Sequence, residues 1–135
     1  MKTITLKSIT LSIFTLFMAA TLLVSCGKSK DNPSPVSSGS HQIVYKATAT
    51  DGTVNIVDYT IASGDQTTIT SLNTATWSSD PITVPTSIGS VVFAVTGHGN
   101  SPSSTITVQI YVDGVLKKTN TGQGTSLSAG TDYTF

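Results

Sequence analysis

Few side chains in this chain are suited to chemistry, and the best placed is its only cysteine, Cys26. It follows Leu23-Val24-Ser25, so leucine stands three residues before the thiol and a small residue directly before it. This is the pattern of a bacterial lipobox. There the thiol receives diacylglycerol, a signal peptidase cuts before the cysteine, and the freed amine takes a further acyl chain such as palmitate. The spacing predicts that residues 1–25 are a lipoprotein signal peptide and that Cys26 is lipidated.

The residues before the lipobox agree with this prediction. Lys2 and Lys7 supply a positive start, and residues 9–23 form an apolar stretch of secretory-signal length. The stretch is too short and too rich in hydroxyls for a permanent span, which needs about 20 apolar residues. The alternative is an ordinary buried thiol at the end of a hydrophobic run. It is disfavoured because an exported chain would then keep one unpaired thiol in an oxidising compartment.

The segment after the lipobox is expected to be a tether. Residues 27–40 are rich in Gly, Ser, Pro and Lys and show no apolar period, so residues 26–40 should form a lipidated cysteine and a disordered spacer. Two or three acyl chains hold a protein to a membrane stably. Gly27, rather than aspartate, after the cysteine favours the outer membrane as the site in the cell envelope.

The two histidines are the next candidates for chemistry. His98 stands between glycines in an expected loop, where a solvated turn histidine is favoured over a catalytic one because no Gly-x-Ser-x-Gly elbow is present. His41, at the end of the tether, is expected to be solvated. The chain has no Glu, no Arg and no second Cys, and its aspartates stand singly, whereas metal sites need several ligands together. We therefore expect no catalytic residue, no metal site, no cofactor and no enzymatic activity.

Two aromatic residues are candidate ligand contacts. Trp77 precedes a polar loop and could stack on a sugar ring, although a core anchor between two sheets is the favoured interpretation. Tyr111 lies on the polar side of its strand and is either a contact or ordinary surface. No nucleic-acid partner is expected, because five Lys face seven Asp after the cysteine and no basic field exists.

The elements that must position these residues are predicted to be short strands. Over residues 41–135 apolar and polar side chains alternate with period two, broken by turn residues about every 8–12 positions. In residues 105–112 the apolar members are Ile106, Val108, Ile110 and Val112. No 3.6-residue period follows Cys26. Residues 41–135 are therefore predicted to be all-β, an immunoglobulin-like antiparallel β-sandwich of about seven short strands.

The turn residues predict where the strands end. Asp51-Gly52 and Asp113-Gly114 are expected as two-residue turns, the second within a hairpin. Residues 97–102 and 122–124, both glycine-rich, are expected as loops. Residues 133–135 are expected to form a final short edge strand.

Several of these segments together resemble a known family. The residues that carry the resemblance are Tyr45, Ile56, Tyr59, Trp77-Ser78, Thr83-Val84-Pro85 and Ile106 through Lys117. They are similar to the mycobacterial MmpS accessory membrane proteins and their lipoprotein look-alikes in Gram-negative bacteria. The resemblance implies a small sandwich outside the membrane that assists a large exporter of lipids or siderophores. That family has a transmembrane helix where this chain has a lipobox, and usually a cysteine where this chain has Val108.

These observations predict a membrane-anchored lipoprotein that presents a non-enzymatic interaction domain. One hypothesis is an accessory to an envelope transport assembly, with the membrane reached through lipid on Cys26 and an envelope protein as partner. The other is a module that binds glycans or another surface ligand. An exposed Trp77 lining a groove would favour the second, whereas a buried Trp77 beside a bare strand edge would favour the first.

Overall fold

The computed structural model describes residues 39–135 of the chain. The predicted signal peptide, Cys26 and the tether up to residue 38 lie outside the described residues. Within residues 39–135 there are nine strands and one short 3-10 helix, η1 (Thr86–Ile88), but no α-helix. No helix in this part of the chain is long and apolar enough to cross a membrane.

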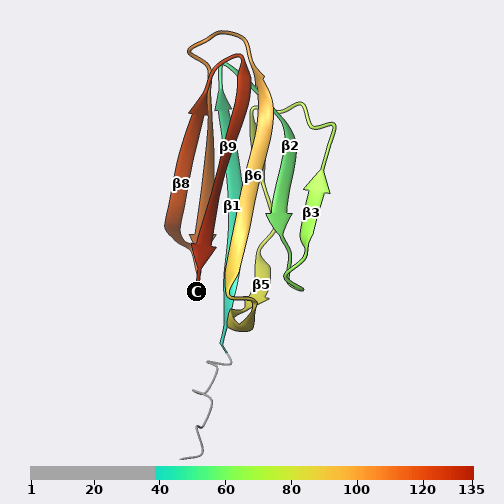
Figure 1. Cartoon of the computed structure of the whole chain (residues 1–135), viewed down its shortest axis with the longest axis vertical. Coiled ribbons are helices and arrows are strands. Elements are labelled where there is room, and N and C mark those ends of the chain that lie inside the picture. The colour runs from blue at the N-terminus through green and yellow to red at the C-terminus, as the bar shows by residue number, and fades with distance from the viewer. Residues whose placement is uncertain (1–38) are drawn as a thin grey trace, which may run out of the picture. The chain divides into compact units, whose positions relative to one another are not determined.

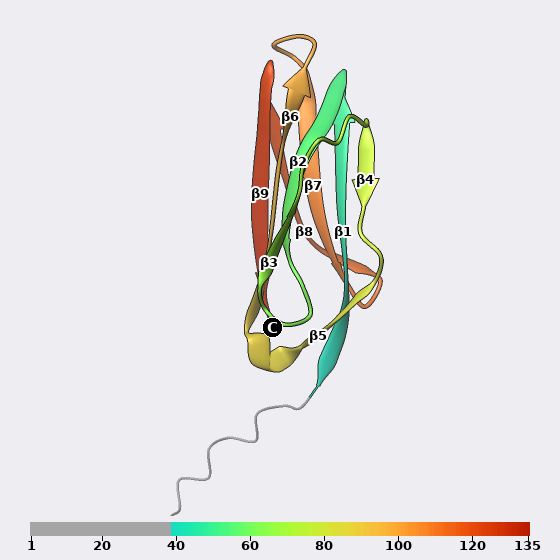
Figure 2. The ribbon, with the colours of Figure 1, turned by 90° about the vertical axis from the view of Figure 1, so that its right-hand side faces the viewer.

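The strands form two antiparallel sheets packed face to face, as the sequence predicts (Figures 1 and 2). In chain order the strands are β1 (Ser40–Thr50), β2 (Gly52–Thr60), β3 (Gln66–Ile69), β4 (Thr76–Ser78), β5 (Ile82–Pro85), β6 (Ser90–Gly99), β7 (Thr105–Val112), β8 (Val115–Gln123) and β9 (Ser126–Thr134). Sheet A has the order β4-β1-β7-β8, with β5 also pairing with β1, and sheet B has the order β3-β2-β6-β9. The fold is a β-sandwich.

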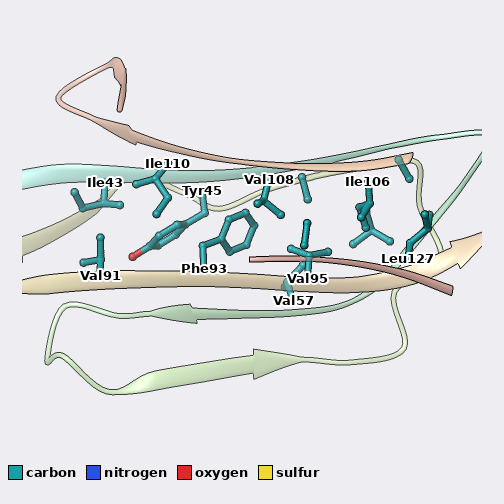
Figure 3. Close-up of a cluster of buried hydrophobic side chains, with 14 of the residues drawn as sticks. Ile43, Tyr45, Val57, Val91, Phe93, Val95, Ile106, Val108, Ile110 and Leu127 are labelled. Carbon is teal, nitrogen blue, oxygen red and sulfur yellow. The ribbon is translucent and has the colours of Figure 1, made fainter. Parts of the chain in front are cut away.

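The core lies between the sheets and follows the period-two pattern (Figure 3). Sheet A contributes Ile43, Tyr45 and the apolar residues of β7 to the core. Sheet B contributes Phe93 and the other buried residues of β6. The fully buried side chains that line this interface are Ile43, Tyr45, Val54, Val57, Val84, Val91, Phe93, Val95, Ile106, Val108, Ile110 and Leu127. Burial of one face of β1, β6 and β7 explains why their apolar residues recur at every second position.

Some of the glycines predicted as loop residues lie inside strands instead. Gly97 belongs to β6 and Gly122 to β8, so the loop after β6 is shorter than predicted and residues 122–123 still pair with β7. A Cβ on Gly97 would collide with the carbonyl oxygen of Thr53, and one on Gly122 with that of Ser128. These glycines allow close approach of neighbouring backbone rather than a turn. They lengthen β6 and β8 beyond their predicted ends, and the described residues form nine strands where about seven were predicted.

The turn predicted at Asp51-Gly52 is present, with Asp51 at φ 56°, and it leads β1 of sheet A into β2 of sheet B. One further expectation needs correction. Residues 133–134 are only the end of β9, which begins at Ser126 and pairs with β6 from Ser90 to His98, and Phe135 lies beyond the strand. In contrast, Asp113-Gly114 closes the predicted hairpin between β7 and β8, with both residues at positive φ.

The burial pattern of β7 yields a stability prediction. Ile110 is fully buried, whereas Thr107 is half-buried on the outer face and bonds Thr121 between hydroxyls at 2.8 Å. Ile110→Ala should lower the free energy of unfolding by about 2–5 kcal/mol, because it removes core volume that its neighbours cannot refill. Thr107→Ala should cost about 1 kcal/mol or less. Denaturant titrations measure both, and a reversed order would contradict this register.

Candidate functional site

Trp77, the first candidate ligand contact, packs into the edge of the core. It sits on the short strand β4 opposite Ala47 of β1 and is half-buried. Its ring centroid lies 5.3 Å from that of Tyr59 and 5.8 Å from that of Phe93. Both of those rings also contact Tyr45, at 5.2 Å. Most of the Trp77 ring therefore serves to cover the side of the sandwich where β4 and β2 face each other.

Tyr111, the second candidate, lies on the outer face of sheet A. Its ring is half-buried beneath the ammonium of Lys46, which stands 4.7 Å from the ring centroid. Its hydroxyl donates to the side-chain oxygen of Gln109 at 3.4 Å. Trp77 points inward and Tyr111 outward, so the structure does not bring the two candidates together into one binding surface.

His98 lies on a strand rather than in the predicted loop. It is exposed near the end of β6, opposite Thr53 on one side and Ser126 on the other. Neither neighbour across the ladder carries a carboxylate or a thiol. The His98 side chain thus has no acid or base beside it in the ladder with which to share a proton.

The sequence predicts a solvated His41, but in the structure this residue belongs to a cluster of interacting side chains that the sequence did not reveal. Its Nδ1 donates to a carboxylate oxygen of Asp113 at 2.6 Å, and its ring stacks on that of Phe135 with centroids 5.3 Å apart. The other carboxylate oxygen of Asp113 accepts from the backbone N–H of Gln42 at 2.9 Å. Asp113 is 72 residues away in sequence, and only its pairing with the start of β1 brings it to His41.

The His41 cluster has the parts of a histidine–carboxylate pair but no nucleophile attached to it. The backbone bond from Gln42 and the side-chain bond from His41 hold the pKa of the Asp113 carboxyl below its ordinary value of 3.8. Both side chains are substantially exposed, and the ring face of His41 is occupied by Phe135. The arrangement ties strand ends together, since it joins the start of β1 to the β7–β8 turn and to the C-terminal residue.

A second carboxylate organises the opposite end of the sandwich. Asp51 accepts hydrogen bonds from the hydroxyls of Ser101 and Ser104 at 2.8 and 2.9 Å and from the amide of Asn100 at 3.2 Å. These bonds lower the pKa of Asp51. Ser104 is itself buried and also donates to the backbone carbonyl of Asp51. The cluster joins the β1–β2 connection to the β6–β7 loop.

Among residues 39–135, no group of three or more His, Cys, Asp or Glu side chains is placed to hold a metal ion. The polar clusters that are present act between strand ends and carry no aligned nucleophile. Comparison with protein-family models and with curated proteins found no match to this chain.

The two lowered carboxyl pKa values predict how stability depends on pH. Each carboxylate is favoured by the folded state, so its contribution is present above its unfolded pKa, near 3.8, and is lost as the pH falls through the lower folded value. Denaturant midpoints of the wild-type chain should therefore drop below about pH 4. Asp113→Asn and Asp51→Asn should each flatten this acid slope. Slopes equal to the wild-type slope would show that neither carboxylate is linked to folding.

Proposed function

We propose that this chain is a bacterial lipoprotein held in the cell envelope, at the outer membrane, by lipid on Cys26. Its sandwich acts as a non-enzymatic interaction module that binds an envelope protein, as an accessory to a transport assembly. The proposal joins the lipobox of the sequence and the MmpS-like resemblance to the surface that the described residues present.

One observation carries the interaction role: β3 is an edge strand whose outer side has no strand beside it in the described part of the chain. It pairs with β2 alone, from Gln66 opposite Thr60 to Ile69 opposite Val57. The outer side of such a strand presents backbone donors and acceptors to which an extended segment of another protein can add. The other end of sheet B is less open, since the Asn120 amide of β8 donates to the carbonyl of Gly130 in β9 at 2.8 Å.

The alternative, a glycan-binding module, has one observation in its favour. Tyr111 is partly exposed on a sheet face that is rich in hydroxyl and amide groups, among them Gln109, Thr107 and Thr121. Sugar binding usually needs a free aromatic face, but Lys46 covers the Tyr111 ring and Trp77 packs on Tyr59 and Phe93. These contacts favour the protein-binding role.

The lipid anchor is tested by labelling cells with a clickable fatty acid. The wild-type protein should carry the label, because the lipobox presents Cys26 for acylation. The Cys26→Ser variant should lose the label and accumulate as uncleaved precursor. Equal labelling of the two proteins would rule out lipidation at this cysteine.

The interaction role is tested by crosslinking in cells followed by mass spectrometry. The wild-type protein should capture a specific envelope protein, and Thr68→Lys should weaken the capture because an edge lysine opposes strand addition. Thr50→Lys changes another exposed threonine, on β1 of sheet A, and as the matched control it should not alter the capture. His98→Ala should also leave capture unchanged.

Three results would count against this role. Capture that is insensitive to Thr68→Lys would place the partner elsewhere than β3. Glycan-array binding that Trp77→Ala abolishes, without any captured protein, would favour the carbohydrate module. Hydrolytic turnover lost on His98→Ala would make the chain an enzyme.

A further inference from the structure

The first two residues of β8, next to the β7–β8 turn, have the most exposed large hydrophobic side chains among the described residues. Val115 is 55% exposed and Leu116 is 42% exposed, and they are adjacent in sequence. We call residues 113–118 the hairpin tip. Val115 pairs with Val112 and Leu116 with Tyr111, so the two side chains point to opposite faces of the hairpin, and both lie in solvent at its tip.

From Leu116 a row of partly buried apolar side chains continues onto the outer face of sheet A, where the Lys46 ammonium lies over the Tyr111 ring. Leu116 lies opposite Tyr111 of β7, and Tyr111 lies opposite Val44 of β1. Directly paired residues share one face of a sheet, so the three side chains form a row across three strands. Tyrosine, with an apolar ring and a polar hydroxyl, is the residue type enriched where a membrane meets water.

Charge at the hairpin tip suits an anionic lipid surface. Lys117 and Lys118 follow Leu116, and Lys46 is the one other lysine within residues 39–135. The one carboxylate in the tip, Asp113, is already engaged by His41 and by the backbone of Gln42. Long lysine side chains can keep their ammonium groups among lipid headgroups while neighbouring apolar groups enter the acyl boundary.

The hairpin tip also lies at the end of the sandwich where the described chain begins. Asp113 donates its backbone N–H to the carbonyl of Gln42, only three residues after Gly39, the first described residue. The loop that contains Asn100 and Ser101 lies at the far end of the strands.

We propose that the hairpin tip docks on the anionic lipid surface to which the chain is anchored, with Val115 and Leu116 in the acyl boundary and Lys117 and Lys118 among the headgroups. This inference rests on the proposed lipid anchor. The hairpin tip would be a second contact with the membrane, in addition to the lipid anchor. It would orient the sandwich so that β3 lies along the side of the domain, away from the lipid-facing tip.

The test uses the full acylated chain, isolated in detergent and mixed with excess phosphatidylglycerol vesicles that contain brominated acyl chains. In the Leu116→Trp variant, the introduced indole should lose emission relative to the same variant with unbrominated lipid. The wild-type chain, whose only tryptophan is Trp77 in the edge of the core, is the blank and should show no loss. Phosphatidylcholine vesicles should give weaker quenching.

Ile56→Trp is the matched control for an exposed indole. Ile56 is 39% exposed, close to Leu116, but it lies on β2 in the other sheet and should not be quenched. Adding Lys117→Gln and Lys118→Gln to Leu116→Trp should lower the ratio of docked to undocked domain roughly 30-fold at low salt. Quenching that is absent, or equal at both positions, would overturn the docking.

Flotation of the same samples separates this inference from the anchor on which it rests. A chain that floats with both vesicle types but shows no quenching keeps the anchor and loses the hairpin contact. A chain that is quenched by the anionic vesicles but does not stay with neutral ones keeps the hairpin contact and loses the anchor. Quenching with flotation supports both.

Discussion

One buried hydroxyl constrains how the two sheets meet. Tyr45 of β1 has no exposed surface, and its hydroxyl donates to the carbonyl of Thr60 on β2 at 2.9 Å. A buried hydroxyl without such a partner costs free energy, so the packing of the two sheets is favoured when it keeps the Tyr45 hydroxyl within reach of the Thr60 carbonyl. The hydroxyl of Thr60 accepts in turn from the backbone of Val92 on β6. Burial also raises the pKa of Tyr45, which keeps the phenol neutral in the core.

The buried position of Tyr45 also limits whether the neighbouring aromatic residues can contact a ligand. Tyr59 and Phe93 pack against Tyr45, and Trp77 packs against both of them from the edge strand β4. A ligand that stacked on Trp77 would compete with the contacts that seal this side of the sandwich. The aromatic cluster therefore contributes to the stability of the fold.

The sequence predicts the parts of this structure that depend on local pattern. The alternation in β7 follows from Ile106 through Val112, because a strand with one buried face repeats every two residues. The role of Gly97 could not be read in this way, since a glycine in a turn and a glycine under a neighbouring carbonyl look alike in sequence. The His41–Asp113 pair was missed for a related reason: 72 residues separate its partners, and only the pairing of β1 with β7 brings them together.

The pairing of β1 with β7 also affects how the sandwich resists a force applied at Gly39. β1 is flanked by β4 and β5 on one side and by β7 on the other, so it is an interior strand of sheet A. A force applied at Gly39 acts along β1 and loads the ladders on both sides together, whereas a force on an edge strand would break its bonds one at a time. The His41–Asp113 bond also links β1 to the β7–β8 turn, so this turn shares the load. An interior strand held by ladders on both sides therefore resists being pulled out of its sheet by a load on Gly39.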